Sequence, residues 1–366
     1  MGQTILKVGI IGQGRSGRDI HGLTLAQLPD HYQIAAIADS LPERQQLAEK
    51  EFGCKAYATW QEMVANEELD LVVNASPSHQ HVPISLELLN RGLNVLCEKP
   101  LARTAEEVDQ LIEASERNGK LLAVFQQSRY LPAYVRIREV IESGVLGRIV
   151  QMDFTSSRFA RRWDWQTLQR NNGGSLLNLG SHVIDQALQL FGSDAMPDIA
   201  CVMERANTFG DAEDYVKILL QGQGRPTVDI EVSSCSVFPG DMFVIQGTNG
   251  GLRGNNERLE WRYFKPEEAP AQQLITEPLV DKNGLPSYCR ETLTWHSDKW
   301  ELALPNGKDE YPYMAEQLYF MLHRTIVDGD PLEITPQQVR RQLAVIEACR
   351  RQNPHIYRQN SEPVRG

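Results

Sequence analysis

The 366-residue sequence has no long hydrophobic run and no excess of positive charge. No apolar stretch approaches the ~20 residues needed to cross a bilayer. The opening residues, MGQTILKVGIIG, have no signal-peptide layout, and Leu6 stands where myristoylation needs serine or threonine. With 37 basic against 48 acidic residues, the net charge is −11. Nucleic acid and membrane surfaces are therefore not expected partners, because both attract basic proteins.

The sequence is also poor in cysteine, with six residues and no CxxC spacing. This pattern does not suggest a disulfide framework, so we expect reduced, mostly buried thiols in a cytoplasmic protein. With 41% hydrophobic and 23% charged residues, the composition is typical of a globular protein. The length suits two domains.

The segment LKVGIIGQGRSGRDIHG combines a short apolar strand, a glycine turn and a helix. Its glycines, Gly12, Gly14 and Gly17, follow the pattern G-x-G-x-x-G. The first permits a tight turn, the second lets a pyrophosphate approach the backbone, and the third lets helix and strand pack closely. The helix start, with Arg15 and Ser16, would face the phosphates. The segment predicts a dinucleotide site.

A second strand, YQIAAIADS, ends at Asp39, about 20 residues farther on, where a ribose-binding acid is expected. A carboxylate there accepts hydrogen bonds from both ribose hydroxyls and repels a 2′-phosphate, which favours NAD. Arg15 and Arg44 could hold a phosphate, which leaves NADP open. Asp39, followed by Ser40, could instead cap the helix LPERQQLAEKEF.

Strands and helices continue to alternate, which predicts a doubly wound parallel sheet, a Rossmann domain, over residues 1–128. Ligands of such sheets bind at the carboxyl ends of the strands. Two polar segments lie at such ends: SPSHQH, with Ser76 and Pro77, and CEKPLA, with Glu98 and Lys99.

The pair His79 and His81 could suggest a metal site. On a helix, however, residues two apart diverge, and no cysteine or carboxylate completes a ligand set. We expect no metal.

The segment GSLLNLGSHVID places Asn178, His182 and Asp185 at i, i+4 and i+7, on one face of a helix. Such a polar stripe is costly against a core but not against a cleft. Simpler interpretations stay open: His182 as a core histidine, Lys99 as a salt-bridge partner, and Asp185 as a surface acid.

The preceding loop, SRFARRWDWQTLQRNNGG, contains Arg158, Trp163 and Trp165. Tryptophan faces cover the C–H face of a sugar ring, and arginine binds its hydroxyls, so we expect a substrate loop. The tryptophans could instead fill the seam between domains. Arg129 and Tyr130, after the strand AVFQQ, are further candidates for the same pocket.

These motifs together resemble the glucose-fructose oxidoreductase/inositol dehydrogenase (Gfo/Idh/MocA) family of NAD(P)-dependent enzymes. The resemblance implies a second domain, residues 129–366, of α+β class with a large open, mainly antiparallel sheet. The outer face of that sheet would form a homodimer or homotetramer, and a helix at about 335–352 would close the domain. The matching pieces are GIIGQGRSG, ASPSHQHV, NVLCEKPLA, GVLGRI, GGSLLNLGSHVIDQALQLFG and DGDPLEITPQQVRRQLAVIEA.

The resemblance implies a dehydrogenase that oxidises a hydroxyl of a sugar, inositol or related cyclic polyol. Lys99 and His182 would be the catalytic pair. His182 suits the role of base, since its unperturbed pKa is ~6.5, and Lys99 can stabilise the developing alkoxide or relay the proton. The resemblance also places His81 near the cofactor and makes the Lys99–Pro100 bond cis.

Asn178 departs from the pattern, because many polyol dehydrogenases of the family carry aspartate there. Asn178 could position a substrate hydroxyl, and Asp185 could hold His182 or another hydroxyl. Two other functions stay open on this scaffold, an NAD-dependent glycoside hydrolase and a non-catalytic NAD(P)-binding regulator.

Overall fold

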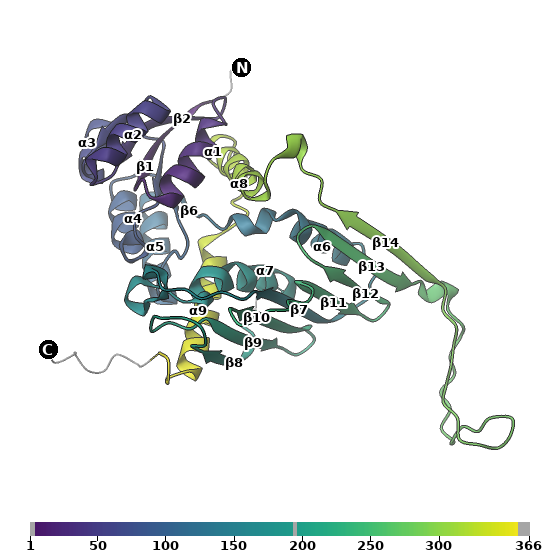
Figure 1. Ribbon diagram of the computed structural model, residues 1–366. Coiled ribbons are helices and arrows are strands. Elements are labelled where there is room, and N and C mark those ends of the chain that lie inside the picture. The colour runs from purple at the N-terminus through teal and green to yellow at the C-terminus, as the bar shows by residue number, and fades with distance from the viewer. Residues whose placement is uncertain (1–3, 193–195, 358–366) are drawn as a thin grey trace.

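The computed structural model describes residues 4–192 and 196–357, which form two sheet-based units (Figure 1). Within these ranges, no helix is long and apolar enough to cross a membrane. The cysteines are all unpaired, as expected. Three of them are buried, whereas Cys235 and Cys289 are exposed.

The first unit is a parallel sheet of six strands in the order β3-β2-β1-β4-β5-β6. Helices α3, α4 and α5 cover one face, and α1 and α2 cover the other, which confirms the predicted doubly wound fold. The strand order reverses between β1 and β4, and this switch point is where such sheets bind ligands. The strands are β1 (Leu6–Ile11), β2 (Tyr32–Ala38), β3 (Lys55–Tyr57), β4 (Leu71–Asn74), β5 (Val95–Cys97) and β6 (Leu122–Val124). The helices are η1 (Arg15–Gly22), α1 (Leu23–Ala26), α2 (Pro42–Phe52), α3 (Trp60–Asn66), η2 (Ser78–Gln80), α4 (His81–Asn90) and α5 (Ala105–Asn118).

The second unit is an eight-stranded sheet in the order β14-β13-β12-β11-β7-β10-β9-β8. Neighbouring strands are antiparallel except β7 and β10, as the resemblance implied. Helices α6, α7 and α9 lie over one face (Figure 1). The strands are β7 (Ile149–Ser157), β8 (Asp198–Glu204), β9 (Tyr215–Gln221), β10 (Thr227–Ser233), β11 (Phe243–Gly247), β12 (Gly250–Gly254), β13 (Arg258–Phe264) and β14 (Trp295–Glu301). The helices are η3 (Gln127–Tyr130), α6 (Pro132–Glu142), η4 (Trp165–Thr167), η5 (Gln169–Asn171), η6 (Leu176–Gly180), α7 (Ser181–Phe191), η7 (Pro266–Glu268), η8 (Pro305–Gly307), α8 (Glu310–Val327) and α9 (Pro336–Gln352).

Helix α8 packs on the first unit, although it belongs to residues 129–366, which the sequence analysis assigned to the second domain. Its buried side chains, among them Leu318, Tyr319 and Leu322, complete the apolar layer that β1 and α1 begin. In Figure 1 α8 lies beside α1, far in sequence but adjacent in space. The chain therefore returns to its first unit before α9 closes the second.

Helix α9 connects the two units. It begins after Thr335, whose hydroxyl accepts the Gln338 N–H in a capping box. Its buried residues, including Val339 and Leu343, belong to one apolar core that runs from the α5 side of the first sheet into the second. This continuous packing fixes the orientation of the two units relative to each other.

Candidate active site

The glycine loop after β1 has the geometry that its pattern predicted. Gly12 has φ +87°, and a Cβ there would lie 2.6 Å from the Ala75 carbonyl oxygen. At Gly17 a Cβ would lie closer still to the Gly12 carbonyl oxygen. Gly14 caps η1 without any side-chain hydrogen bond, and the space beside it is open. The first turn of η1, with exposed Arg15 and half-buried Ser16, can therefore receive a phosphate.

Asp39 lies buried at the end of β2 and joins the glycine loop to the next helix. Its Oδ2 accepts the Gln13 backbone N–H at 2.7 Å and lies 3.3 Å from Arg44 Nη1. Its Oδ1 accepts the Leu41 N–H at 3.0 Å, so the carboxylate also contributes to the start of α2. Asp39 is not the N-cap of α2, because that position belongs to Leu41, which has no side-chain cap bond; Ser40 beside Asp39 is exposed.

His81, the last residue of the polar segment after β4, is buried and contacts the segment after β5. Its Nδ1 lies 2.8 Å from the Pro100 carbonyl oxygen and its Nε2 lies 2.9 Å from the Ser76 carbonyl oxygen. Burial opposes protonation, but contacts with the Cys97 sulfur, the Pro100 carbonyl and the Glu98 carboxylate raise the pKa of His81 to about 9. An imidazolium can donate to both carbonyls, so His81 ties these segments together.

Ser76 and Pro77 form the turn after β4. The Ser76 hydroxyl donates to Asn74 Oδ1 at 2.7 Å, and Pro77 is exposed at the start of η2. The Lys99–Pro100 bond after β5 is cis, as the resemblance implied. The two turns thus follow neighbouring strands, β4 and β5, at the carboxyl edge of the sheet, where such sheets bind ligands.

The side chains of Glu98 and Lys99 point to different units of the protein. The Glu98 carboxylate lies 3.2 Å from His21 Nε2, inside the first unit. Burial alone would raise the pKa of Glu98, but the contact with His21 and the Lys99 charge outweigh it and lower the pKa. Lys99 reaches the other unit, where its Nζ donates to the Asn178 carbonyl oxygen at 3.0 Å and to Asn178 Oδ1 at 3.3 Å.

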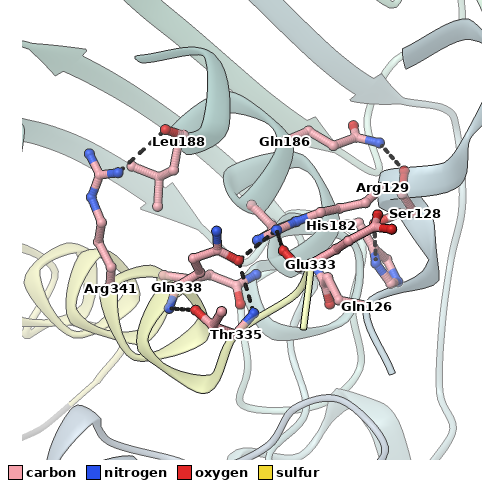
Figure 2. A network of polar contacts seen from close by, with 12 residues as sticks. Gln126, Ser128, Arg129, His182, Gln186, Leu188, Glu333, Thr335, Gln338 and Arg341 are labelled. Carbon is pink, nitrogen blue, oxygen red and sulfur yellow. Dashed lines mark hydrogen bonds and ion pairs between the residues drawn. The ribbon is translucent and has the colours of Figure 1, made fainter. Parts of the chain in front are cut away.

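His182 lies four residues beyond Asn178, at the start of α7. Its Nδ1 is 3.0 Å from Ser128 Oγ (Figure 2). Burial, and then the nearby Lys99 ammonium, lower the pKa of His182 to about 3. Burial also lowers the pKa of Lys99, with Arg15 adding to the effect and Glu98 opposing it. Lys99 of the first unit thus contacts Asn178 of the second, and His182 lies one helical turn farther on, close enough for the Lys99 charge to lower its pKa.

Asp185 and Arg129 form a buried ion pair with each other. The Asp185 carboxylate is fully buried and accepts Arg129 Nε and Nη2, both at 2.7 Å. Arg129 also donates to Gln338 Oε1 at 2.6 Å and to the Glu333 carbonyl at 3.2 Å, as the network in Figure 2 shows. Asp185 thus faces the core and holds Arg129, whereas His182 is held by Ser128.

The other predicted substrate residues divide into two groups. Tyr130 donates to Glu333 Oε2 at 2.9 Å, and exposed Arg158 is fixed through its backbone N–H to Ser233. Trp163 is 77% exposed. Trp165 lines a small pocket together with Lys99 and Asn178. Trp165 therefore lines this pocket, whereas Tyr130, Arg158 and Trp163 do not.

Two residues near the site carried no sequence signal. Tyr311, at the start of α8, accepts a hydrogen bond from Gln127 Nε2 at 2.9 Å. Burial and then the Glu98 charge raise the pKa of the Tyr311 phenol, and Arg15 opposes them. These two residues are 184 positions apart, so no local pattern could join them.

Residues 4–192 and 196–357 contain no group of three or more histidine, cysteine or acidic residues that could hold a metal. A larger hollow of about 470 Å³ lies between α5, the end of α8 and the start of α9. It contains none of the predicted site residues.

Fold and site together define a two-domain dinucleotide-binding oxidoreductase. The family model described as "Oxidoreductase family, NAD-binding Rossmann fold" matches residues 6–126, and the "GFO/IDH/MocA C-terminal domain" matches residues 134–253. The chain belongs to the Gfo/Idh/MocA family, and its first domain is an NAD-binding Rossmann domain.

Relatives in this family include named dehydrogenases. An uncharacterised oxidoreductase of Schizosaccharomyces pombe is 32% identical over 256 residues, 68% of this chain and 69% of the relative. The scyllo-inositol 2-dehydrogenase (NADP(+)) of Bacillus subtilis is 27% identical over 94% of this chain and 92% of its own. A levoglucosan dehydrogenase in complex with NADH and levoglucosan superposes with a TM-score of 0.77 at 20% identity, covering 96% of this chain and 98% of that one, which shows the shared fold.

Proposed function

We propose that this protein oxidises a secondary hydroxyl of a sugar, inositol or related cyclic polyol with NAD. The observation that carries the proposal is the contact of Lys99 Nζ with Asn178, which brings this lysine of the first unit to the helical segment of the second unit that holds His182. Its relatives include an inositol dehydrogenase and a D-glucoside 3-dehydrogenase of Escherichia coli, the latter 30% identical over 53% of this chain and 56% of its own.

The bound nicotinamide would supply the hydride acceptor, and the protein would supply position and proton transfer. Gly14 would leave room for the pyrophosphate, with Arg15 and Ser16 beside it, while Gly12 and Gly17 allow the tight turn and the close packing of the loop. Asp39 would accept hydrogen bonds from the ribose hydroxyls, which favours NAD, and Arg44, whose Nη1 lies 3.3 Å from Asp39 Oδ2, would bind the 2′-phosphate of NADP. Ser40, Ser76, Pro77, His81 and Glu98 complete the cofactor side in this proposal.

Lys99 and His182 would share the handling of the substrate hydroxyl. Two of the three Lys99 N–H groups point to Asn178, which leaves a third for the reacting oxygen. When His182 Nδ1–H donates to Ser128, its Nε2 lone pair is available for the hydroxyl proton. Negative charge that develops on the substrate oxygen raises the proton affinity of this neutral imidazole, while the Lys99 cation stabilises the same charge.

A substrate panel tests the proposed function. Sugars, inositols and their glycosides are incubated with NAD and NADP in parallel, and the absorbance of the reduced cofactor is followed. We expect reduced NAD to accumulate with at least one free sugar or polyol. Glycoside cleavage without net cofactor reduction would instead indicate a glycoside hydrolase, and cofactor binding without turnover of any compound would indicate a regulator.

The pH profile of kcat/KM should lack an acid limb near the ordinary histidine pKa of about 6.5. The reason is that His182, with its pKa lowered to about 3, is already neutral above that value. On the alkaline side, activity should fall as the Lys99 cation is lost, and at lower pH than the ordinary lysine value of 10.5, because burial lowers this pKa. An acid limb near 6.5 that disappears in a His182→Asn variant would contradict this assignment.

We further propose a cytoplasmic homo-oligomer that forms through the outer face of the eight-stranded sheet. In Figure 1 the helices lie over one face, and the other has no layer of its own. Residues on that other face, such as Lys217, Asp229 and Glu231, form ion pairs and are only partly exposed. Such a face is suited to a second copy rather than to an apolar core.

A further inference from the structure

The chain between β13 and β14 has no part in the proposed reaction. In Figure 1 it leaves the eight-stranded sheet, runs away from both units as a long extended arm and then returns to the sheet. We define this arm as residues 270–292. None of its residues is buried, and no hydrogen bond joins it to any other described part of the chain. The arm therefore adds nothing to the packing of its own copy.

The arm nevertheless has a defined hairpin at its tip. Val280 and Pro286 form an antiparallel bridge. Between them, Asp281 Oδ1 accepts the backbone N–H groups of Asn283 and Leu285 at 2.8 and 2.9 Å. Because these backbone groups are paired within the arm, the tip keeps its shape without support from the two units.

Large apolar side chains of the arm lie in solvent. Five of them are more than half exposed: Leu274 (88%), Ile275 (52%), Val280 (61%), Leu285 (60%) and Tyr288 (85%). Isolated exposed apolar residues are common, but a group of them within one short segment is typical of a contact surface for another protein. The arm has three acidic and two basic residues, so it does not attract nucleic acid or an anionic membrane, which bind basic segments.

The base of the arm lies on the outer face of the eight-stranded sheet. Leu259 of β13 is buried in the core, and side chains alternate along a strand, so Phe264 points to the opposite face. Phe264 pairs directly with Trp295 of β14, their ring centroids 6.1 Å apart. Trp295 is still 45% exposed, and in Figure 1 the arm extends away from α6 and α7. Exposed apolar side chains thus continue from the arm onto the face without helices.

We propose that the arm clasps a second copy of this chain that docks on the outer face of the sheet. This inference rests on the homo-oligomer proposed above and specifies how its subunits hold each other. The 12 residues from Pro270 to Asp281 span about 40 Å when extended, whereas packed sheets lie about 10 Å apart. The arm is therefore long enough to pass the edge of the partner's sheet. In a two-fold dimer each copy receives the other's arm, so the contact forms twice.

Sedimentation velocity over a series of protein concentrations tests this inference. The wild-type protein should be oligomeric at micromolar concentration. Replacing residues 270–292 with a short glycine–serine linker should raise the dissociation constant by about 100-fold or more, because several large apolar side chains lose their contact in both arms. Phe264 and Trp295 are paired neighbours at the base, so a short linker can join the two strands. Circular dichroism checks that the variant folds.

A pair of point substitutions tests the side chains without removing the arm. Leu285→Asp combined with Tyr288→Asp should raise the dissociation constant by about 10-fold or more, because charges replace apolar contact surface. Both side chains are exposed, so the fold of the single copy should not change. Leu47→Asp is the matched control, since Leu47 is an exposed leucine of α2 in the first unit, and it should associate as the wild-type protein does.

The possible failures have different signatures. An unchanged dissociation constant in both arm variants would overturn the inference, while an oligomer formed through the sheet alone would stand. A wild-type protein that stays monomeric at all concentrations would overturn the oligomer and the arm contact together. The substrate panel is a separate measurement, so an absence of turnover would count against the proposed reaction and not against the arm.

Discussion

Replacing Lys99 with methionine should lower kcat by about 10³-fold or more, because the variant loses a proton-transfer partner and the cation that stabilises the alkoxide. Methionine retains a long, unbranched apolar side chain. The residues placed for the cofactor are otherwise unchanged, so the NAD dissociation constant should stay within a few-fold. Steady-state kinetics with the best substrate and a fluorescence titration with NADH measure the two quantities.

Lys50→Met provides the matched control, because Lys50 is an exposed lysine in the last turn of α2. It should retain wild-type kcat. Turnover by Lys99→Met within 10-fold of the wild-type rate, with intact NADH binding, would remove Lys99 from the mechanism.

Asp185→Asn should lower the free energy of unfolding by about 3–5 kcal/mol, the usual cost of removing one partner of a buried ion pair. The carboxylate is fully buried and both of its oxygens accept Arg129 N–H groups at 2.7 Å. The variant leaves the buried Arg129 guanidinium without its counter-ion. Urea unfolding followed by circular dichroism measures the change.

The double variant Asp185→Leu with Arg129→Met separates charge from packing. Apolar pairs of similar volume often replace a buried ion pair at little cost, so this double variant should be more stable than Asp185→Asn alone. A loss below about 1 kcal/mol in Asp185→Asn would mean that Arg129 is satisfied by Gln338 and Glu333 without Asp185.

Asn178, His182 and Asp185 do not all share one environment, although their spacing in the sequence suggests that they do. Their spacing predicts one helical face, and Asn178 does contact Lys99, whose charge also lowers the pKa of His182. Asp185 turns to the core instead. The reason is partly local, because Leu176–Gly180 forms a wider helical turn that shifts the phase before α7 begins. A long-range contact is the other reason, because Asp185 pairs with Arg129, which lies 56 residues earlier in the chain.

The sequence by itself determined the alternating architecture of the first domain, the glycine turn and the positions of Asp39 and Lys99 at strand ends. These features follow from local rules, since periodicity and backbone freedom act over a few residues. Only the tertiary structure decided which polar groups pair: Lys99 with Asn178, 79 residues away, His21 with Tyr319, 298 residues away, and Asp185 with Arg129. Such contacts depend on how the helices and sheets pack against one another. The residues next to a side chain in the sequence do not determine that packing.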